Sequence, residues 1–341
     1  MTVHTPTEAE QVTAALAAAC GRHFDSPAAI ERMGRESGGA SRQTWSFDAV
    51  ADGRRHELIL RRDPPVKERG ERERSAALDR STEFHVLRAA HAAGVRAPEV
   101  LFELAPEDGI GEGFVMRRID GTAIARKLLR DPPYEGARGK ITGQLGEILA
   151  RLHATPLGTL PPLDRREAAD QIASLRHTLD SMGYAQPVFE LALSWLDRRR
   201  PAPIERPVLV HGDYRTGNYL ADESGVTAIL DWEGAHLGDP VEDLGWLCVK
   251  SWRFGAIDRP AGGFGSRETL WAAYERAGGV RVDPARAHWW EVFGTVRWGI
   301  ICHTQAWKHL SGAQKSMELA SIGRRAVETE VDLLQLLKQA A

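Results

Sequence analysis

The sequence has little cysteine and no long apolar run. Its three cysteines, Cys20, Cys248 and Cys302, lie far apart and form no CxxC or CxxH spacing. This pattern argues against a disulfide framework and against structural zinc, and it fits a reducing cytoplasm. No segment approaches the roughly 18 consecutive apolar residues that a membrane-spanning helix needs. We therefore expect a soluble, cytoplasmic protein that does not bind a membrane.

Charge of one sign is not concentrated anywhere in the chain. The formal net charge is -3, and no block of like charge rises above the mixed background. Nucleic acid is therefore not an expected partner, whereas a small-molecule substrate fits. Because 341 residues are too many for one ordinary core and 43% of them are hydrophobic, we expect two folded lobes of unequal size. The sequence does not indicate an oligomeric state.

The most informative stretch is residues 207–247, PVLVHGDYRTGNYLADESGVTAILDWEGAHLGDPVEDLGWL. Its residues 208–210 predict a short buried strand, so the carboxylate of Asp213 follows directly from a rigid element. Asn218 comes five residues later. The residues after it predict a strand, a turn and a second strand, and this hairpin returns Asp231 to the neighbourhood of Asn218.

The spacing His-x-Asp-x-x-x-x-Asn, followed by a hairpin and Asp, matches the catalytic loop and metal-binding aspartate of the protein-kinase signature. HGDYRTGN and LDWEGAHLGDPVEDLGWL resemble the aminoglycoside phosphotransferase-like (kinase-like) family. They look most like the branch that includes the kinase domain fused to some acyl-CoA dehydrogenases. The resemblance implies a bilobal α+β fold. Residues 1–117 would form a small antiparallel sheet with a helix, and residues 118–341 a larger, mainly helical lobe.

The resemblance also implies phosphoryl transfer from Mg-ATP to an alcohol group of a small molecule. Asp213 would then accept or orient the proton of the acceptor hydroxyl, while Asn218 and Asp231 bind one or two magnesium ions on the phosphates. The competing structural interpretation is a strand with a polar turn, but a hairpin alone has no need of all three side chains. Whether ATP or GTP is the donor stays open.

Three charged residues near this loop have structural interpretations. Asp239, followed by proline, fits the N-cap of a helix, and Asp243 is expected to hydrogen-bond the catalytic loop from behind. Arg215 either orients Asp213 or a phosphate, or pairs with Asp243 or Glu233.

The N-terminal region predicts a helix that opens at 6–8 and ends at Gly21, followed by antiparallel strands between residues 29 and 62. Asp52-Gly53 supplies a hairpin turn, and Gly34 belongs to an earlier, glycine-rich turn. Gly38, Gly39, Ala40 and Ser41 lie at the tip of that turn. They would cover the ATP phosphates with their amide groups, or form a plain turn, since the full GxGxxG motif is missing.

The strand LILR ends in Arg61, where kinases carry a phosphate-binding lysine. Arginine can bind phosphate through two parallel hydrogen bonds, and Arg62 falls on the opposite face of the strand. A helix is expected from Leu78 to Ala93, and its Glu83 is the predicted partner of Arg61. The alternatives are an exposed cation on an edge strand and a solvated surface glutamate.

A second hairpin, 100–104 with 113–117, is expected to close the small sheet. The chain then crosses between the lobes at residues that include Met116 and Arg118, where the family holds adenine through backbone hydrogen bonds. Met116 is equally compatible with an ordinary core position.

The rest of the chain predicts helices. They are expected at 141–156, with His153 packing at its end, and at 168–182, 187–199, 267–277, 284–308 and 316–338. Seven of the ten tryptophans follow residue 240. They suggest an aromatic wall beside the phosphate donor, although at least half are expected to fill the core.

The acceptor is only partly indicated. Residues 240–341 contain 13 Lys plus Arg and 11 Asp plus Glu, an excess of +2, so an apolar or anionic hydroxyl compound fits better than a polycationic aminoglycoside. By resemblance, a hydroxyacyl-CoA or hydroxy acid comes first and a macrolide or another antibiotic second. A non-catalytic nucleotide-binding pseudokinase is the alternative class, suggested by arginine at position 61. Hydrolase and protein-kinase activities are disfavoured, because GxSxG and Ala-Pro-Glu motifs are missing.

Overall fold

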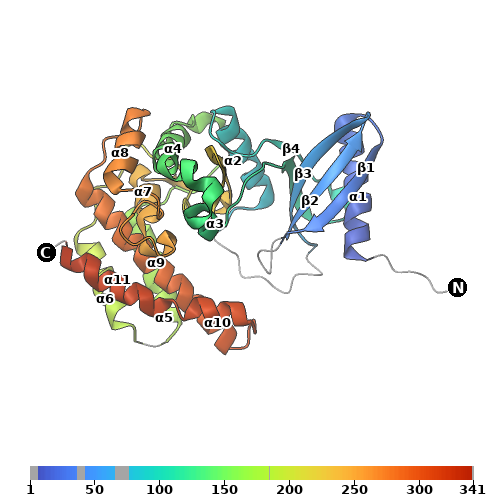
Figure 1. Ribbon diagram of the computed structural model, residues 1–341. Helices are drawn as coiled ribbons and strands as arrows, with labels where there is room; N and C mark the ends of the chain where they lie inside the picture. The colour runs from blue at the N-terminus through green and yellow to red at the C-terminus, as the bar shows by residue number, and fades with distance from the viewer. Residues whose placement is uncertain (1–6, 37–42, 66–76, 184, 340–341) are drawn as a thin grey trace. The chain divides into compact units, whose positions relative to one another are not determined.

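The structure is a computed structural model that describes residues 7–36, 43–65, 77–183 and 185–339. It divides into two compact units, which we describe separately (Figure 1). Unit 1 comprises residues 1–120, 158–162 and 228–235, and unit 2 comprises the remaining segments. No helix in the described part of the chain is long and apolar enough to cross a membrane. The division into lobes at residues 1–117 and 118–341 stays a prediction.

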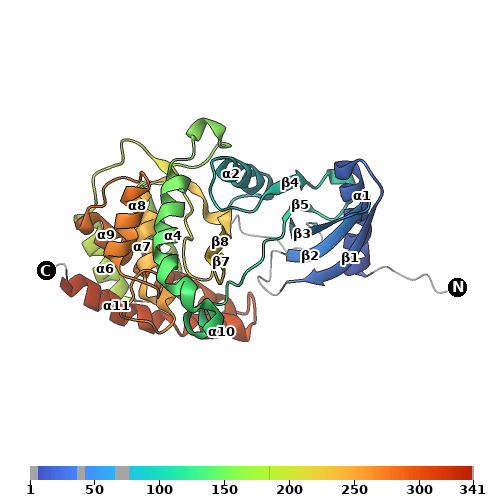
Figure 2. The same cartoon turned by 45° about the horizontal axis from the view of Figure 1, so that its top comes forward.

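Unit 1 contains a five-stranded antiparallel sheet in the order β1-β2-β3-β5-β4 (Figure 2). Helix α1, Glu8–Phe24, packs on this sheet, and Leu16, Phe47 and Leu58 are among the fully buried core residues. The strand bounds are β1 Ala28–Arg35, β2 Gln43–Ala51, β3 Arg54–Asp63, β4 Val100–Glu103 and β5 Glu112–Arg117. The predicted small sheet with a helix is therefore present.

Two predicted boundaries in unit 1 are wrong. Helix α1 continues past Gly21 to Phe24, because Asp25 adopts the left-handed conformation and its N–H bonds the carbonyl of Gly21 to close the last turn. Gly34 lies inside β1 rather than in a turn, next to a register shift between Glu31 and Gly34. The turn at Asp52 and Gly53 is present, with both residues at positive φ.

Helix α2, Arg80–Ala92, completes unit 1. Asp79 caps its N-terminus by accepting a hydrogen bond from the backbone N–H of Thr82 at 2.7 Å. The side chains of Phe84 and Leu87 are buried, and Glu83 is fully buried as well. The helix therefore presents a carboxylate from its apolar face.

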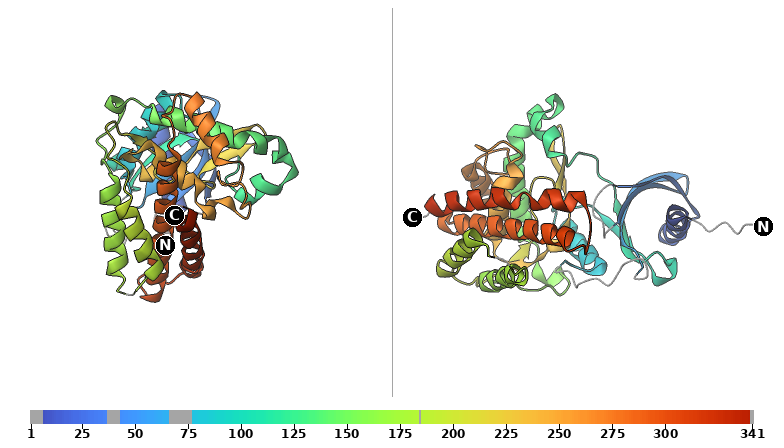
Figure 3. Two further views of the ribbon diagram at one scale, coloured as in Figure 1. Left: turned by 90° about the vertical axis from the view of Figure 1, so that its left-hand side faces the viewer. Right: turned by 90° about the horizontal axis from the view of Figure 1, so that it is seen from below.

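Unit 2 is mainly helical, as predicted (Figure 3). Its helices are α3 Ala125–Arg130, α4 Glu135–His153, α5 Ala168–Ser181, α6 Pro187–Arg198, α7 Pro240–Cys248, α8 Arg267–Arg276, α9 Pro284–Leu310, α10 Met317–Gly323 and α11 Ala326–Gln339. Two short strand pairs accompany them: β6 Val208–Val210 with β9 His236–Gly238, and β7 Tyr219–Asp222 with β8 Gly225–Ile229. Strand β8 runs across the boundary into unit 1.

Helix α9 is the centre of unit 2, with α6, α7, α10 and α11 packed against it. Glycines allow helices α7 and α9 to approach each other closely. A Cβ on Gly245 of α7 would lie 2.5 Å from the Cβ of Trp290, and a Cβ on Gly294 of α9 would lie 3.0 Å from Trp246 Cε3. The packing of α7 against α9 matters for function, since α7 supports the loop that follows β6.

The single helix predicted for residues 316–338 is wrong. The chain forms α10 and α11 with a break at Arg324 and Arg325. A Cβ on Gly323 would lie 2.6 Å from the Cβ of Ala306 in α9. Both short helices pack against α9, and α10 contacts it closely at Gly323, directly before the break.

Candidate active site

The loop after β6 is held from behind by one buried carboxylate. Asp243 of α7 accepts hydrogen bonds from the backbone N–H of His211 at 2.8 Å and of Gly212 at 2.9 Å. His153 Nε2 lies 3.4 Å from the same carboxylate. Burial by itself would raise the pKa of Asp243, but the hydrogen bond and charge of His153 and the contacts with His211 bring the pKa below its ordinary value. The predicted supporting role of Asp243 is confirmed, as is the packing role of His153.

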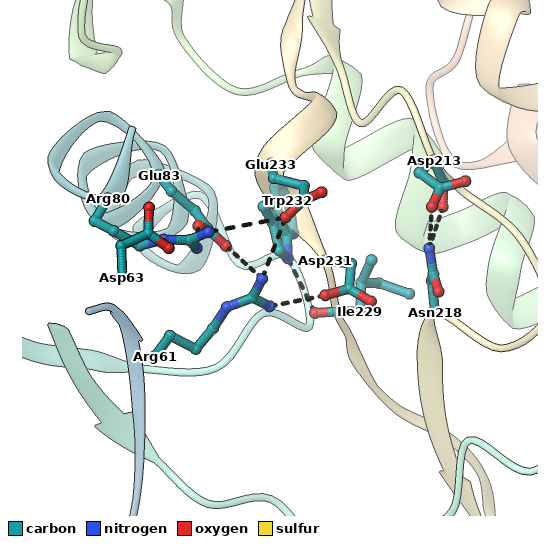
Figure 4. Close-up of polar contacts among 10 residues, drawn as sticks. All are labelled: Arg61, Asp63, Arg80, Glu83, Asp213, Asn218, Ile229, Asp231, Trp232 and Glu233. Carbon is teal, nitrogen blue, oxygen red and sulfur yellow. Dashed lines mark hydrogen bonds and ion pairs between the residues drawn. The ribbon is translucent and has the colours of Figure 1, made fainter. Parts of the chain in front are cut away.

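Asp213 is oriented by three donors. Its Oδ1 accepts hydrogen bonds from Trp246 Nε1 at 2.7 Å and Arg215 Nε at 3.1 Å. Its Oδ2 accepts one from Asn218 Nδ2 at 2.5 Å (Figure 4). The Asp213 side chain is still 30% exposed. A carboxylate that is fixed in direction and open to solvent can orient the proton of an incoming hydroxyl.

Arg215 takes the first of its predicted alternatives, since it bonds Asp213 rather than Asp243 or Glu233. Asn218 is 4% exposed and uses its Nδ2 for both of its side-chain hydrogen bonds, to the carboxylate and to the backbone carbonyl of Asp213. Its Oδ1 accepts no hydrogen bond from the part of the chain that is described. An amide oxygen in this position is a suitable ligand for a hard cation.

Arg61 lies in a cluster of acidic side chains within unit 1. Its Nη1 is 2.8 Å from Asp231 Oδ1, and its Nη2 is 3.4 Å from Glu83 Oε1 and 3.7 Å from Glu233 Oε2 (Figure 4). The predicted ion pair of Arg61 with Glu83 is therefore present. Strand β3 is central rather than at an edge, and the Arg61 side chain is only 13% exposed, so the exposed-cation alternative is wrong. Burial opposes the charge of Arg61, but Glu83 and Asp231 raise its pKa above the ordinary value.

A second arginine joins this cluster. Arg80 forms ion pairs with Glu83 and with Asp63, the latter at 3.3 Å, and lies 3.9 Å from Glu233. Two guanidinium groups thus face four carboxylates, those of Asp63, Glu83, Asp231 and Glu233. Counting only these six side chains, all within the described ranges, the cluster has a formal charge of -2, and Asp231 is its most exposed carboxylate at 46%. A site rich in carboxylates suits a divalent cation.

No group of three or more His, Cys, Asp or Glu side chains in the described ranges is arranged to hold a metal by itself. Magnesium does not require such a group. It keeps several waters and is usually held by one or two protein oxygens together with substrate phosphates. The amide oxygen of Asn218 and the exposed carboxylate of Asp231, each considered within its own unit, fit that limited contribution.

The remaining predicted residues are placed as follows. Gly38, Gly39 and Ser41 lie outside the described residues. Met116 is buried in β5, 6% exposed, between Ile59 of β3 and Val100 of β4. The Arg118 side chain forms ion pairs with Glu57 at 2.5 Å and Asp48 at 3.2 Å. Roles for these residues in nucleotide binding stay predictions.

The predicted site residues fall into two groups. Arg61, Glu83 and Asp231 come together in unit 1, and Asp213, Arg215 and Asn218 come together in unit 2. The expected convergence of Asp231 with Asp213 and Asn218 around one nucleotide stays a prediction.

The sequence analysis missed three contributors to these groups. Trp246 was assigned to a general aromatic wall, yet its indole N–H bonds Asp213. The signal was present, because Trp246 follows Asp243 by three residues and so lies on the same face of α7. Arg80 had a similar signal, because it precedes Glu83 by three residues on α2. Glu233 had no such signal, since its proximity to Arg61 depends on the path of the chain between distant segments.

Comparison with known proteins identifies a family and related structures. The sequence model of the phosphotransferase enzyme family matches residues 35–280. Acyl-CoA dehydrogenase family member 10 of Mus musculus is 30% identical over 179 residues, 49% of this chain and 16% of that protein. Acyl-CoA dehydrogenase family member 11 of Gallus gallus is 30% identical over 179 residues, 48% of this chain and 22% of that protein. The matched region thus spans less than a quarter of these relatives.

Solved structures show the same fold at low sequence identity. A protein of Ralstonia eutropha JMP134, provisionally assigned as an aminoglycoside phosphotransferase, is 22% identical with a TM-score of 0.72, covering 96% of this chain and 98% of its own. A spectinomycin phosphotransferase in complex with ADP and spectinomycin is 14% identical with a TM-score of 0.63, covering 97% and 100%. A macrolide 2'-phosphotransferase of Brachybacterium faecium is 19% identical with a TM-score of 0.59, covering 92% and 97%.

These structures confirm the predicted α+β, kinase-like fold class. The family match covers well over half of the chain and includes most of both groups of site residues, from Arg61 to Asp243. The resemblance inferred from the motif after β6 is confirmed as well. The chain belongs to the phosphotransferase enzyme family.

Proposed function

We propose that this protein transfers the γ-phosphoryl group of ATP to a hydroxyl group of a small molecule. The observation that carries the proposal is the carboxylate of Asp213, which Trp246, Arg215 and Asn218 orient while it remains 30% exposed. Family membership supports the reaction type. The ADP bound by the spectinomycin phosphotransferase supports the choice of nucleotide.

In the proposed reaction, Asp213 orients the acceptor hydroxyl and accepts its proton as the oxygen attacks the γ-phosphorus in line with the departing ADP. Alignment of the hydroxyl oxygen with the γ-phosphorus supplies much of the rate acceleration, because the protein forms no covalent bond with the transferred group. Arg215 and Trp246 keep the carboxylate pointed at the hydroxyl. Asp243 keeps the whole loop in place through its two backbone hydrogen bonds.

Asn218 and Asp231 would hold magnesium, and the bound ion would offset the negative charge of the ATP phosphates. Arg61, positioned by Glu83 at 3.4 Å, binds a phosphate oxygen in the place of the usual lysine. The backbone amides of Gly38, Gly39 and Ser41, which lie outside the described residues, would contact the phosphates in this proposal. The chain around Met116 and Arg118 holds the adenine.

For the acceptor we propose a hydroxyacyl-CoA or related hydroxy acid. The matched region in both curated relatives belongs to proteins named for acyl-CoA dehydrogenation, and the segment after residue 240 carries an excess of two positive charges. We place the reaction in the cytoplasm, where ATP is available and where the three free, buried cysteines are compatible with a reducing environment.

The test is a screen of hydroxylated metabolites, acyl-CoAs and antibiotics with purified protein and Mg-ATP. Mass spectrometry detects a product that has gained one phosphoryl group. A phosphorylated hydroxy acid or hydroxyacyl-CoA supports the proposal, whereas a phosphorylated macrolide or aminoglycoside would replace its acceptor. Nucleotide binding without any product across the panel would favour a pseudokinase instead.

A further inference from the structure

Three tryptophans of unit 2 pack together beside Asp213. The ring centroids of Trp246 and Trp252 are 5.2 Å apart, and those of Trp252 and Trp298 are 4.8 Å apart. A guanidinium group lies over Trp246, that of Arg297, at 4.8 Å from the ring centroid. Another, that of Arg215, lies over Trp252 at 4.6 Å. The proposed catalytic carboxylate therefore lies next to a mostly buried aromatic cluster that carries two guanidinium groups.

Arg297 differs from the other arginines in this region. Its Nη1 donates a hydrogen bond to the backbone carbonyl of Gly212, the residue before Asp213, at 2.8 Å. Arg215 is paired with Asp213, whereas no described carboxylate forms an ion pair with Arg297. Its Nε and Nη2 donate to no residue in the described ranges. A half-buried arginine thus keeps one face of its donor fork available.

The positive charge of Arg297 affects a neighbouring arginine, Arg166. Burial lowers the pKa of Arg166, and the positive charge of Arg297 lowers it further, against the opposing effect of Glu242 and Asp164. Arg297 therefore contributes positive charge beside the loop. A positive potential next to the acceptor position attracts an anion and repels a polyamine.

We propose that Arg297 binds an anionic group of the acceptor, a carboxylate or a phosphate, while the acceptor hydroxyl lies at Asp213. This inference rests on the phosphotransferase function proposed above and narrows its substrate to anionic hydroxy compounds. Arginine matches carboxylate and phosphate geometry through two parallel hydrogen bonds, and the free side of the Arg297 fork provides them.

Trp246 links the two subsites. Its indole N–H bonds Asp213, and the face of the same ring carries Arg297. Gly294, one turn before Arg297 in α9, leaves room for the ring, because a Cβ there would lie 3.0 Å from Trp246 Cε3. A rigid ring between the hydroxyl and anion subsites fixes their separation, so activity should depend on the length of the acceptor.

The test uses a series of straight-chain ω-hydroxy carboxylates of increasing length, each paired with its uncharged primary amide. The matching ω-hydroxyalkyl phosphates distinguish phosphate from carboxylate recognition. We expect kcat/KM with Mg-ATP to favour the anion over the amide by at least about tenfold, with an optimum at one length. Arg297→Gln should remove this preference, and Arg297→Lys should keep part of it.

The matched control is Arg199→Gln, since Arg199 also lies over a tryptophan, Trp195, at 5.2 Å at the end of α6. It should leave the preference unchanged. Mg-AMP-PNP binding by Arg297→Gln should equal that of the parent, which separates lost acceptor recognition from misfolding. Phosphorylation of amides as fast as of anions, or an unchanged preference in Arg297→Gln, would overturn the inference and leave the phosphotransferase function standing. A complete lack of product from every hydroxyl compound would overturn both.

Discussion

At the scale of single residues, the site depends on how Asp213 is held. Its two carboxylate oxygens have different partners, Trp246 and Arg215 on Oδ1 and Asn218 on Oδ2. A carboxylate fixed in this way loses little orientational freedom when a hydroxyl binds. Each donor can therefore be tested separately.

Replacing Asp213 with Asn removes the group that accepts the proton while keeping the size of the side chain. We expect turnover to fall at least ~100-fold, the usual range for loss of a general base. Binding of Mg-AMP-PNP, measured by calorimetry, should change little. Near-normal turnover would contradict the role of Asp213.

Trp246→Phe keeps an aromatic ring but deletes the 2.7 Å hydrogen bond to Asp213. Because a hydrogen bond to a charged group contributes about 1.5–3 kcal/mol, we expect kcat to fall roughly tenfold or more with the KM for ATP unchanged. Trp289→Phe is the control, as the indole N–H of Trp289 bonds the backbone carbonyl of Leu196. If both variants lose the same fraction of kcat, Trp246 does not position Asp213.

At the scale of elements, α7 supports the catalytic loop through Asp243. The pKa of Asp243 is lower in the folded protein than the ordinary value of 3.8 for an aspartate. Its contribution to stability is therefore fully present above about pH 3.8 and is lost as the pH falls through the lower, folded pKa. We expect Asp243→Asn to lower the free energy of unfolding by about 2–5 kcal/mol at pH 7, because an amide cannot accept both backbone hydrogen bonds of the loop.

Urea unfolding at several pH values measures this effect. The difference in unfolding free energy between the parent and Asp243→Asn should shrink as the pH falls well below 3.8. A difference that stays constant down to the lowest pH at which the protein folds would show that the charge of Asp243 is not responsible.

The contact between α7 and α9 gives a prediction about packing. Gly245→Ala would place a Cβ 2.5 Å from the Cβ of Trp290, and such overpacking costs about 1–3 kcal/mol. Gly143 of α4 is the matched control, since a Cβ there meets nothing within 4 Å. Gly143→Ala should stabilise the protein by about 0.5–1 kcal/mol. Chemical unfolding compares the two, and equal effects would argue against a tight α7–α9 contact.

At the scale of the whole molecule, the acidic cluster around Arg61 predicts that nucleotide binding depends on magnesium. Mg-AMP-PNP at about 100 times its Kd should raise the unfolding free energy by ~2.7 kcal/mol. Removal of magnesium with EDTA should largely abolish this gain, because the cluster's formal charge of -2 repels free phosphates. Asp231→Asn should weaken the magnesium dependence, and the thermal shift of each protein with and without magnesium measures it.

Several features could be predicted from sequence because they depend on local order along the chain. Three such features are present: the strand before Asp213, the hairpin after Asn218, and the start of α7 with Asp239 as its N-cap and proline as its first residue. Each arises from a few neighbouring residues. The pairing of Arg61 with Glu83 was predicted from the family resemblance rather than from local pattern. Element ends were less predictable, because Asp25 rather than Gly21 closes α1 and α9 packing divides the last predicted helix.

By itself, the sequence determined the identity and order of the chemical groups: Arg61, then Glu83, then Asp213, Asn218 and Asp231, on a sheet followed by helices. Only the tertiary structure decided which side chains meet them. Trp246 reaches Asp213, Arg297 reaches the loop carbonyl, and Arg80 and Glu233 join Arg61. The reason is physical. These contacts join residues from distant segments, and side-chain packing between those segments, rather than local propensity, sets where their polar atoms lie.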